Sequence, residues 1–257
     1  MHSLHVLYSS VSPKDWQCVV YVYAARHVKD FWEAPELKSL YELCDVIEAP
    51  NQRFTTNLRM VQPSFLISSG YTYVFILLDD VRLKPDFSIT SFLSIMQRNN
   101  LTVASPRIEG AYSGDGQRFR EIMQVKPKKG SVGMRTTFLE FFACVMTIPA
   151  YTSLWKLLFP AINPYGWGYD LWYDCVALQD NPHHAMGLVS IYTAVHDQDL
   201  NKTERTDNAT VATKWKALLQ QEKHYAHHYR LNLRKCRAKV ANRRKPHQGG
   251  GQLESLL

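Results

Sequence analysis

The sequence lacks several features that would place a protein in a class at once. No apolar run reaches about 18 residues, so no segment is predicted to span a bilayer. The opening stretch MHSLHVLYSSVSPKDW has neither the basic start nor the long apolar core of a secretory signal. GxSxG, GxGxxG and P-loop patterns are also absent, which argues against serine hydrolases, dinucleotide redox enzymes and nucleotide hydrolysis.

Cysteine is sparse, and none of the five cysteines forms a CxxC pair. An odd number of widely spaced cysteines argues against a disulfide framework and against a zinc site. Cys18, Cys44 and Cys144 stand among apolar neighbours, so we expect them to be buried core thiols.

Positive charge is concentrated near the C-terminus. Residues 230–245 carry eight Lys and Arg and no acid; removing these eight from the 30 Lys and Arg leaves 22, against 23 Asp and Glu. The net charge of +7 is therefore interpreted as a property of the tail. Nucleic-acid-binding domains more often spread basic residues over a folded face, so a nucleic-acid partner is not favoured, although weak phosphate binding by this segment stays open.

Strand-like and helix-like segments alternate along the first 200 residues. Asp86 is expected to cap one helix, and Pro63 to kink another. The pattern predicts an α/β fold with a mainly parallel mixed sheet flanked by helices over 1–200, followed at 201–257 by a helical basic extension with a loose end. The expected strands are 18–24, 44–50, 73–80, 101–106, 136–149 and 186–196, and the expected helices are 34–43, 55–70, 86–100, 150–160 and 211–244.

Two of these strands end in residue types that can bind metal ions. The apolar run YVFILLDD, residues 73–80, ends in Asp79 and Asp80, and the last strand ends at His196. Ligands bind beyond the carboxyl ends of strands in open α/β sheets, so these residues predict a site for Mg²⁺ or Mn²⁺. The alternative is structural: Asp often closes a turn after a strand, and a single His is commonly a packing residue.

The stretch PYGWGYD suggests a second part of the site. Gly166 and Gly168 allow a tight turn around Trp167, whose flat indole suits the apolar face of a sugar. Asp170 could serve as a general base or bind an acceptor hydroxyl. An N-capping carboxylate and a core tryptophan would explain the same residues.

Taken in order, these stretches carry a resemblance to a family. YVFILLDDVRL, FLEFFACVMTIPAYTSLW, YGWGYDLWYDCVA, GLVSIYTAVHDQD and VATKWKAL resemble glycosyltransferases of the GT-A fold, in particular a plant and bacterial family of unknown function labelled "lysine-ketoglutarate reductase trans-splicing related". The resemblance implies Asp80 as the main metal ligand, with His196 as a second. It also implies Asp170 on the acceptor side and Glu140 at the family's acidic position, where it would bind substrate.

The resemblance implies a metal-dependent transfer of a sugar from a nucleotide-sugar donor, UDP-sugar above others, to an acceptor hydroxyl. The alternative is a non-catalytic glycan-binding or scaffold protein, because Leu78 replaces the first acid of the family's acidic triplet and the N-terminal part is short. The expected compartment is the Golgi or another secretory lumen if an upstream anchor is missing, and otherwise the cytoplasm. Glycosylation sequons at Asn100, Asn201 and Asn208 favour the lumen.

Overall fold

The computed structural model describes most of the chain between residues 42 and 229, together with shorter pieces on either side. The described residues are 6–7, 12, 14–22, 42–50, 52–110, 121–141, 143–166, 168–196, 211–229, 232, 236 and 251–255. The expected helix 34–43 falls almost entirely outside them, as do Trp167 and most of the basic segment 230–245. Among the described residues, no helix is both long and apolar enough to cross a membrane.

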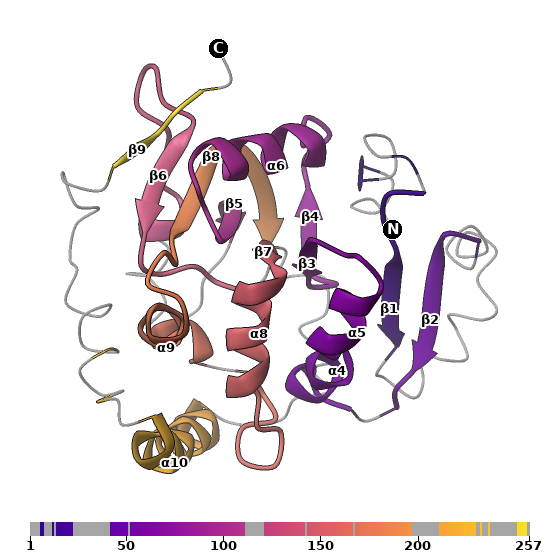
Figure 1. Cartoon of the computed structure of the whole chain (residues 1–257), viewed down its shortest axis with the longest axis vertical. Helices are drawn as coiled ribbons and strands as arrows, with labels where there is room; N and C mark the ends of the chain where they lie inside the picture. Colours follow the sequence, from indigo (N-terminus) through magenta and orange to yellow (C-terminus); the bar gives the residue numbers. More distant parts are fainter. Residues whose placement is uncertain are drawn as a thin grey trace.

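A mixed seven-stranded sheet forms the centre of the molecule (Figure 1). The strands lie in the order β3-β7-β5-β8-β6-β9, with β4 beside the far end of β8. They are β3 (Tyr73–Leu77), β4 (Val81–Leu83), β5 (Val103–Gly110), β6 (Gly133–Thr136), β7 (Ala143–Thr147), β8 (Met186–His196) and β9 (Gln252–Leu253). The mixed α/β architecture with flanking helices confirms the expected fold class.

Strand directions show more antiparallel neighbours than the alternation of strand and helix suggests. β5 and β8 are parallel, whereas β3 and β5 each run antiparallel to β7, which lies between them. β4 and β6 also pair antiparallel with β8. β3, β5 and β8 nevertheless all end at the same edge of the sheet, because an antiparallel strand inserted between two others leaves their shared direction unchanged.

Helices cover the sheet and the region below it in Figure 1. The helices are α4 (Phe54–Met60), α5 (Pro63–Ser68), α6 (Ile89–Arg98), α8 (Ile148–Leu157), α9 (Tyr173–Asp180) and α10 (Val211–Tyr229), with a short 3₁₀ turn η3 at Tyr169–Leu171. The break between α4 and α5 lies at Pro63, as predicted. The cap of α6 is Ser88, which accepts from the Ser91 N–H, so the prediction of Asp86 is wrong.

The long strand predicted at 136–149 is shorter in the structure. Only Ala143–Thr147 pair with neighbouring strands, and Ile148 already begins α8. Thr147 caps that helix by accepting from the Ala150 N–H, and Pro149 occupies its first turn, where a missing N–H costs nothing. The apolar run alone could not separate these states, since a buried strand and the start of a buried helix have the same composition.

Two disulfides correct the prediction about cysteine. Cys18 in β1 (Cys18–Val22) faces Cys44 in β2 (Cys44–Glu48), its register partner in a small parallel pair, and the two are bonded. Cys175 in α9 is bonded to Cys236. Both bonds join residues that only the fold brings together, so spacing in the sequence did not reveal them. Cys144 is the free, buried core thiol that was predicted.

The C-terminal end is ordered where it is described, contrary to the expected loose tail. β9 pairs with β6 at the margin of the sheet, and Leu253 is only 1% exposed. The amide of Asn99 donates to the Glu254 carbonyl, and the Glu254 N–H donates back to Asn99 Oδ1. A two-residue strand has no periodicity of its own, so the sequence could not predict it.

Candidate functional site

The register of the sheet gathers the predicted acidic residues at one edge. Leu77 at the end of β3 pairs with Ala143 at the start of β7, so the turn bearing Asp79 and Asp80 lies beside the segment bearing Glu140. His196 ends β8 at the same edge. Side chains from three separate segments therefore lie at one edge of the sheet.

Asp80 and His196 are in direct contact across this edge. Val81 pairs with His196 in the ladder between β4 and β8, which brings the neighbouring Asp80 over the imidazole. The Nε2 of His196 lies 3.0 Å from Asp80 Oδ2. The imidazole is almost covered, with 7% of its side chain exposed, whereas 41% of the Asp80 side chain is exposed. The predicted meeting of these two residues is confirmed, and the Asp80 side chain is partly open to solvent.

One oxygen of Asp80 is available to a further ligand, and the other is bonded to His196. The Oδ1 of Asp80 is buried and has no hydrogen-bond partner among the described residues, which leaves a carboxylate oxygen for another ligand. The 3.0 Å contact between Asp80 Oδ2 and His196 Nε2 is a hydrogen bond, so a metal ion would have to take the place of the shared proton to use both atoms as ligands. Within the described ranges no third His, Cys, Asp or Glu completes a cluster. Mg²⁺ sites commonly use one or two protein ligands, with substrate phosphates and water supplying the rest.

A second pair of acids lies at the same edge of the sheet. Glu140, just before β7, is hydrogen-bonded to Asp170 in the 3₁₀ turn η3. Burial raises the pKa of the Asp170 carboxyl to about 6, against the effect of hydrogen bonds from Glu140, the Leu171 N–H and its own N–H. The pKa of Glu140 is raised well above its ordinary value, by burial first and then by the charge of Asp170. Of the two acids, Glu140 is therefore the one that holds its proton more strongly, and it donates that proton in the hydrogen bond to Asp170.

The glycine turn that precedes Asp170 is built as its sequence predicts. Gly166 and Gly168 have φ values of 71° and 89°, in the left-handed region that glycine adopts without strain. Both also approach other segments closely: a Cβ on Gly166 would lie 2.5 Å from the Phe54 ring, and one on Gly168 would lie 2.7 Å from Leu218. The tight turn is thus confirmed, and contacts within the protein account for both glycines. Trp167 lies outside the described residues, and substrate binding by this turn stays a prediction.

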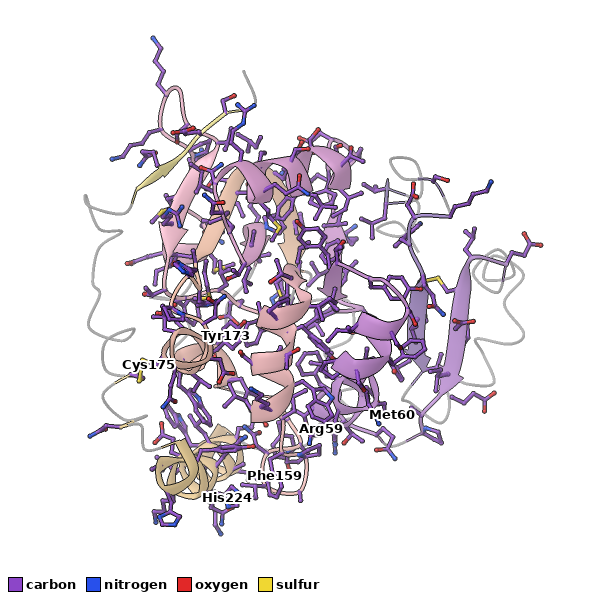
Figure 2. All side chains as sticks on the ribbon, in the orientation of Figure 1. Arg59, Met60, Phe159, Tyr173, Cys175 and His224 are labelled. Carbon is purple, nitrogen blue, oxygen red and sulfur yellow. A yellow bond between two sulfur atoms is a disulfide. The ribbon has the colours of Figure 1, made fainter. Side chains whose placement is uncertain are left out.

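Helix α10 supports the turn from the outside. Gln221 is completely buried, and its Nε2 donates to the Leu157 carbonyl at 2.8 Å and to the Tyr169 hydroxyl at 2.9 Å. One turn further along, His224 stacks on Phe159, with ring centroids 5.0 Å apart. Both residues are labelled in Figure 2. This helix was predicted to belong to an extension outside the main domain. Nothing in the local sequence distinguishes Gln221 from its neighbours, so its position beside the site could not be predicted.

Comparisons with known proteins agree with this architecture. Residues 5–243 match the family described as "Protein of unknown function (DUF707)", so the chain belongs to that family. No curated protein matches the chain. The structure is similar to TarS of S. aureus, residues 1–349, crystallised in complex with UDP-GlcNAc: the TM-score is 0.56 at 11% identity, over 94% of this chain and 66% of that one. A197 from STIV matches at a TM-score of 0.39 and 10% identity, over 70% of this chain and 85% of that chain.

Proposed function

We propose that this DUF707-family chain is a glycosyltransferase that moves a sugar from a nucleotide-sugar donor, a UDP-sugar first, to an acceptor hydroxyl. The observation that carries the proposal is the contact between Asp80 and His196 at the sheet edge that also holds Glu140 and Asp170. The likeness in fold to TarS, a structure in complex with UDP-GlcNAc, supports the choice of donor.

Asp80 and His196 are the residues that would hold a Mn²⁺ or Mg²⁺ ion, with Asp79 beside them in the turn. Such an ion would neutralise the charge of the donor diphosphate. The Asp80 side chain is partly open to solvent, and the buried imidazole of His196 fixes the position of its carboxylate by a hydrogen bond. Leu78, in place of the family's first acid, contributes no oxygen, so binding depends on Asp80 more than it would in an intact triplet.

Asp170 is the proposed general base. Its carboxyl has a pKa near 6, so it is ionised at pH 7 but basic enough to take a proton from an acceptor hydroxyl as the new bond forms. Glu140 holds that carboxylate in place by donating its own proton, and the adjacent N–H of Leu171 adds a second donor. Trp167, between the two glycines, is proposed to offer its ring to a sugar.

We place this activity in an oxidising compartment such as the Golgi or another secretory lumen. Disulfides persist in such compartments and are rare in the reducing cytosol. The two bonds Cys18–Cys44 and Cys175–Cys236 use four of the five cysteines of the chain.

Donor binding can be measured without knowledge of the acceptor. Thermal unfolding of the purified chain is followed with Mn²⁺ and UDP or UDP-sugars, separately and together. We expect stabilisation only when both are present, since a ligand that binds the native state raises the unfolding temperature. Asp80→Ala should abolish the shift, and Asp86→Ala, an exposed acid beyond the other end of β4, should preserve it.

Two results would count against the proposal. One is the absence of any shift with common nucleotide sugars and metal in the unaltered chain. The other is glycan binding that a chelator leaves unchanged, which would favour a non-catalytic glycan-binding protein instead. Asp170→Asn separates binding from chemistry: this variant should keep the thermal shift given by donor and metal and lose sugar transfer.

A further inference from the structure

The turn after helix α6 presents an asparagine that none of the proposed chemistry uses. Asn100 begins the triplet Asn100-Leu101-Thr102, which has the acceptor pattern for N-linked glycosylation. We propose that Asn100 carries an N-linked glycan. The proposal goes beyond sugar transfer by this chain, because here the chain is the acceptor and another enzyme transfers the oligosaccharide to it.

The local geometry exposes this side chain and buries those on either side of it. Asn99 is 7% exposed, because its amide donates to the Ile95 carbonyl and to the C-terminal strand segment at Glu254. Leu101 is 4% exposed and belongs to the core. Asn100, between them, is exposed and has a φ of 49°, in the left-handed region. A glycan attached here would leave the surface without displacing any packed group.

Local structure also explains two residues of the triplet, Asn100 and Thr102. It further indicates whether glycosylation precedes or follows folding. Asparagine tolerates the left-handed region better than most residues, so it suits the end of α6. The Thr102 hydroxyl donates to the Ala185 carbonyl at 3.0 Å and lies 2.8 Å from His184 Nδ1. Because this hydroxyl is engaged once the chain has folded, modification has to precede folding, while the triplet is still extended and accessible.

The chemistry requires a donor that the secretory lumen supplies. A lipid-diphosphate-linked oligosaccharide is that donor: the Asn100 side-chain nitrogen bonds to its anomeric carbon, the lipid diphosphate leaves, and the amide loses one proton to the transferring enzyme. The disulfides Cys18–Cys44 and Cys175–Cys236 independently place the chain where such donors are used. Exposure of the acceptor and oxidation of the cysteines are separate observations that point to the same compartment.

The glycan would lie far from the candidate site. Asn100 precedes β5, whose other end, Gly110, pairs with His196 at the site edge. Eight residues of strand, at about 3.3 Å each, separate the two ends by more than about 20 Å. Occupancy at Asn100 and donor binding at Asp80 can therefore be tested separately, and failure of either proposal leaves the other standing.

The test directs the full chain into the secretory lumen of a eukaryotic host by a cleavable leader. The secreted protein is treated with peptide N-glycosidase in ¹⁸O-labelled water and analysed by mass spectrometry. We expect labelled aspartate at position 100. Asn100→Gly, which keeps the left-handed turn without an acceptor, should lose one glycan step on a gel, whereas Asn201→Gln should leave the label at position 100 in place.

Two outcomes would overturn the proposal. The first is secreted protein with Asn100 unmodified, and with Asn100→Gly running at the mobility of the parent. The second is secreted protein whose cysteines all react with an alkylating agent after denaturation, because the compartment argument depends on both disulfides. Thr102→Ser, which keeps the acceptor pattern and a hydroxyl, should retain the glycan, and loss of the glycan in this variant would equally contradict the assignment.

Discussion

Replacing Asp170 with asparagine should make the protein more stable at neutral pH while removing the proposed base. The Asp170 pKa is raised from 3.8 to about 6, mainly by burial, so the folded protein holds an ionised carboxylate that water solvates better in the unfolded chain. Roughly two pKa units correspond to about 3 kcal/mol of destabilisation. Asparagine has nearly the same shape and can still accept the proton that Glu140 donates, but it carries no charge.

The effect should depend on pH in one direction. Below about pH 4 Asp170 is protonated in both the folded and the unfolded states, and the variant should match the parent. Between pH 4 and 6 the folded state binds more protons than the unfolded state at this position, so the parent loses stability as the pH rises. Above pH 6 the whole difference of about 3 kcal/mol is present, which corresponds to about 6 °C in a protein of this size.

Thermal unfolding from pH 4 to pH 8 measures this difference directly. Asp86→Asn, at an exposed position, is the matched control for the loss of one carboxylate. A pH-independent difference for Asp170→Asn, or a variant less stable than the parent at pH 7, would show that the hydrogen bonds to the Asp170 carboxylate outweigh its desolvation. The assignment of a pKa near 6, and with it the role of general base at neutral pH, would then be wrong.

Three further changes test the support of the site. Gln221→Leu should lower stability by roughly 1 kcal/mol in thermal unfolding, because the Tyr169 hydroxyl and the Leu157 carbonyl each lose one of two donors. Gly168→Ala should cost more than that, since it adds left-handed strain to a clash with Leu218; Leu218→Ala in the same chain should relieve only the clash. Leu253→Ala should destabilise by roughly 2–3 kcal/mol if β9 belongs to the fold, and should have no effect if the C-terminal end is loose.

The sequence predicted the parts of the site that local pattern encodes. The apolar run that ends at Asp79 and Asp80, and the strand that ends at His196, were visible because both strands are mainly apolar and end abruptly in polar side chains. β3 is less buried than its apolar sequence suggests, since Ile76 alone of its five residues is fully buried. The rule that ligands gather beyond strand ends then predicted that Asp80 and His196 would meet, and they lie 3.0 Å apart.

What the sequence could not predict depends on the register between distant segments. The hydrogen bond between Glu140 and Asp170 joins the segment before β7 to a 3₁₀ turn that no local period marks. The bond between Cys18 and Cys44 likewise requires two strands in one particular register, 26 residues apart in sequence. Neither contact leaves a signal in a window of ten or fifteen residues. The spacing of the cysteines therefore indicated free thiols where the fold forms disulfides.

The division of the chain at residue 200 stays a prediction, but helix α10, which lies beyond it, packs against the turn that precedes Asp170. Leu218 fills the space that Gly168 leaves open, and Gln221 bonds the hydroxyl of Tyr169, the residue before the proposed base. The bond between Cys175 and Cys236 then ties the chain beyond α10 back to α9. If α10 moved away, the turn before Asp170 would lose the packing of Leu218 and the hydrogen bond of Gln221 together. The position of the carboxylate proposed as the base therefore depends on residues about fifty positions further along the chain.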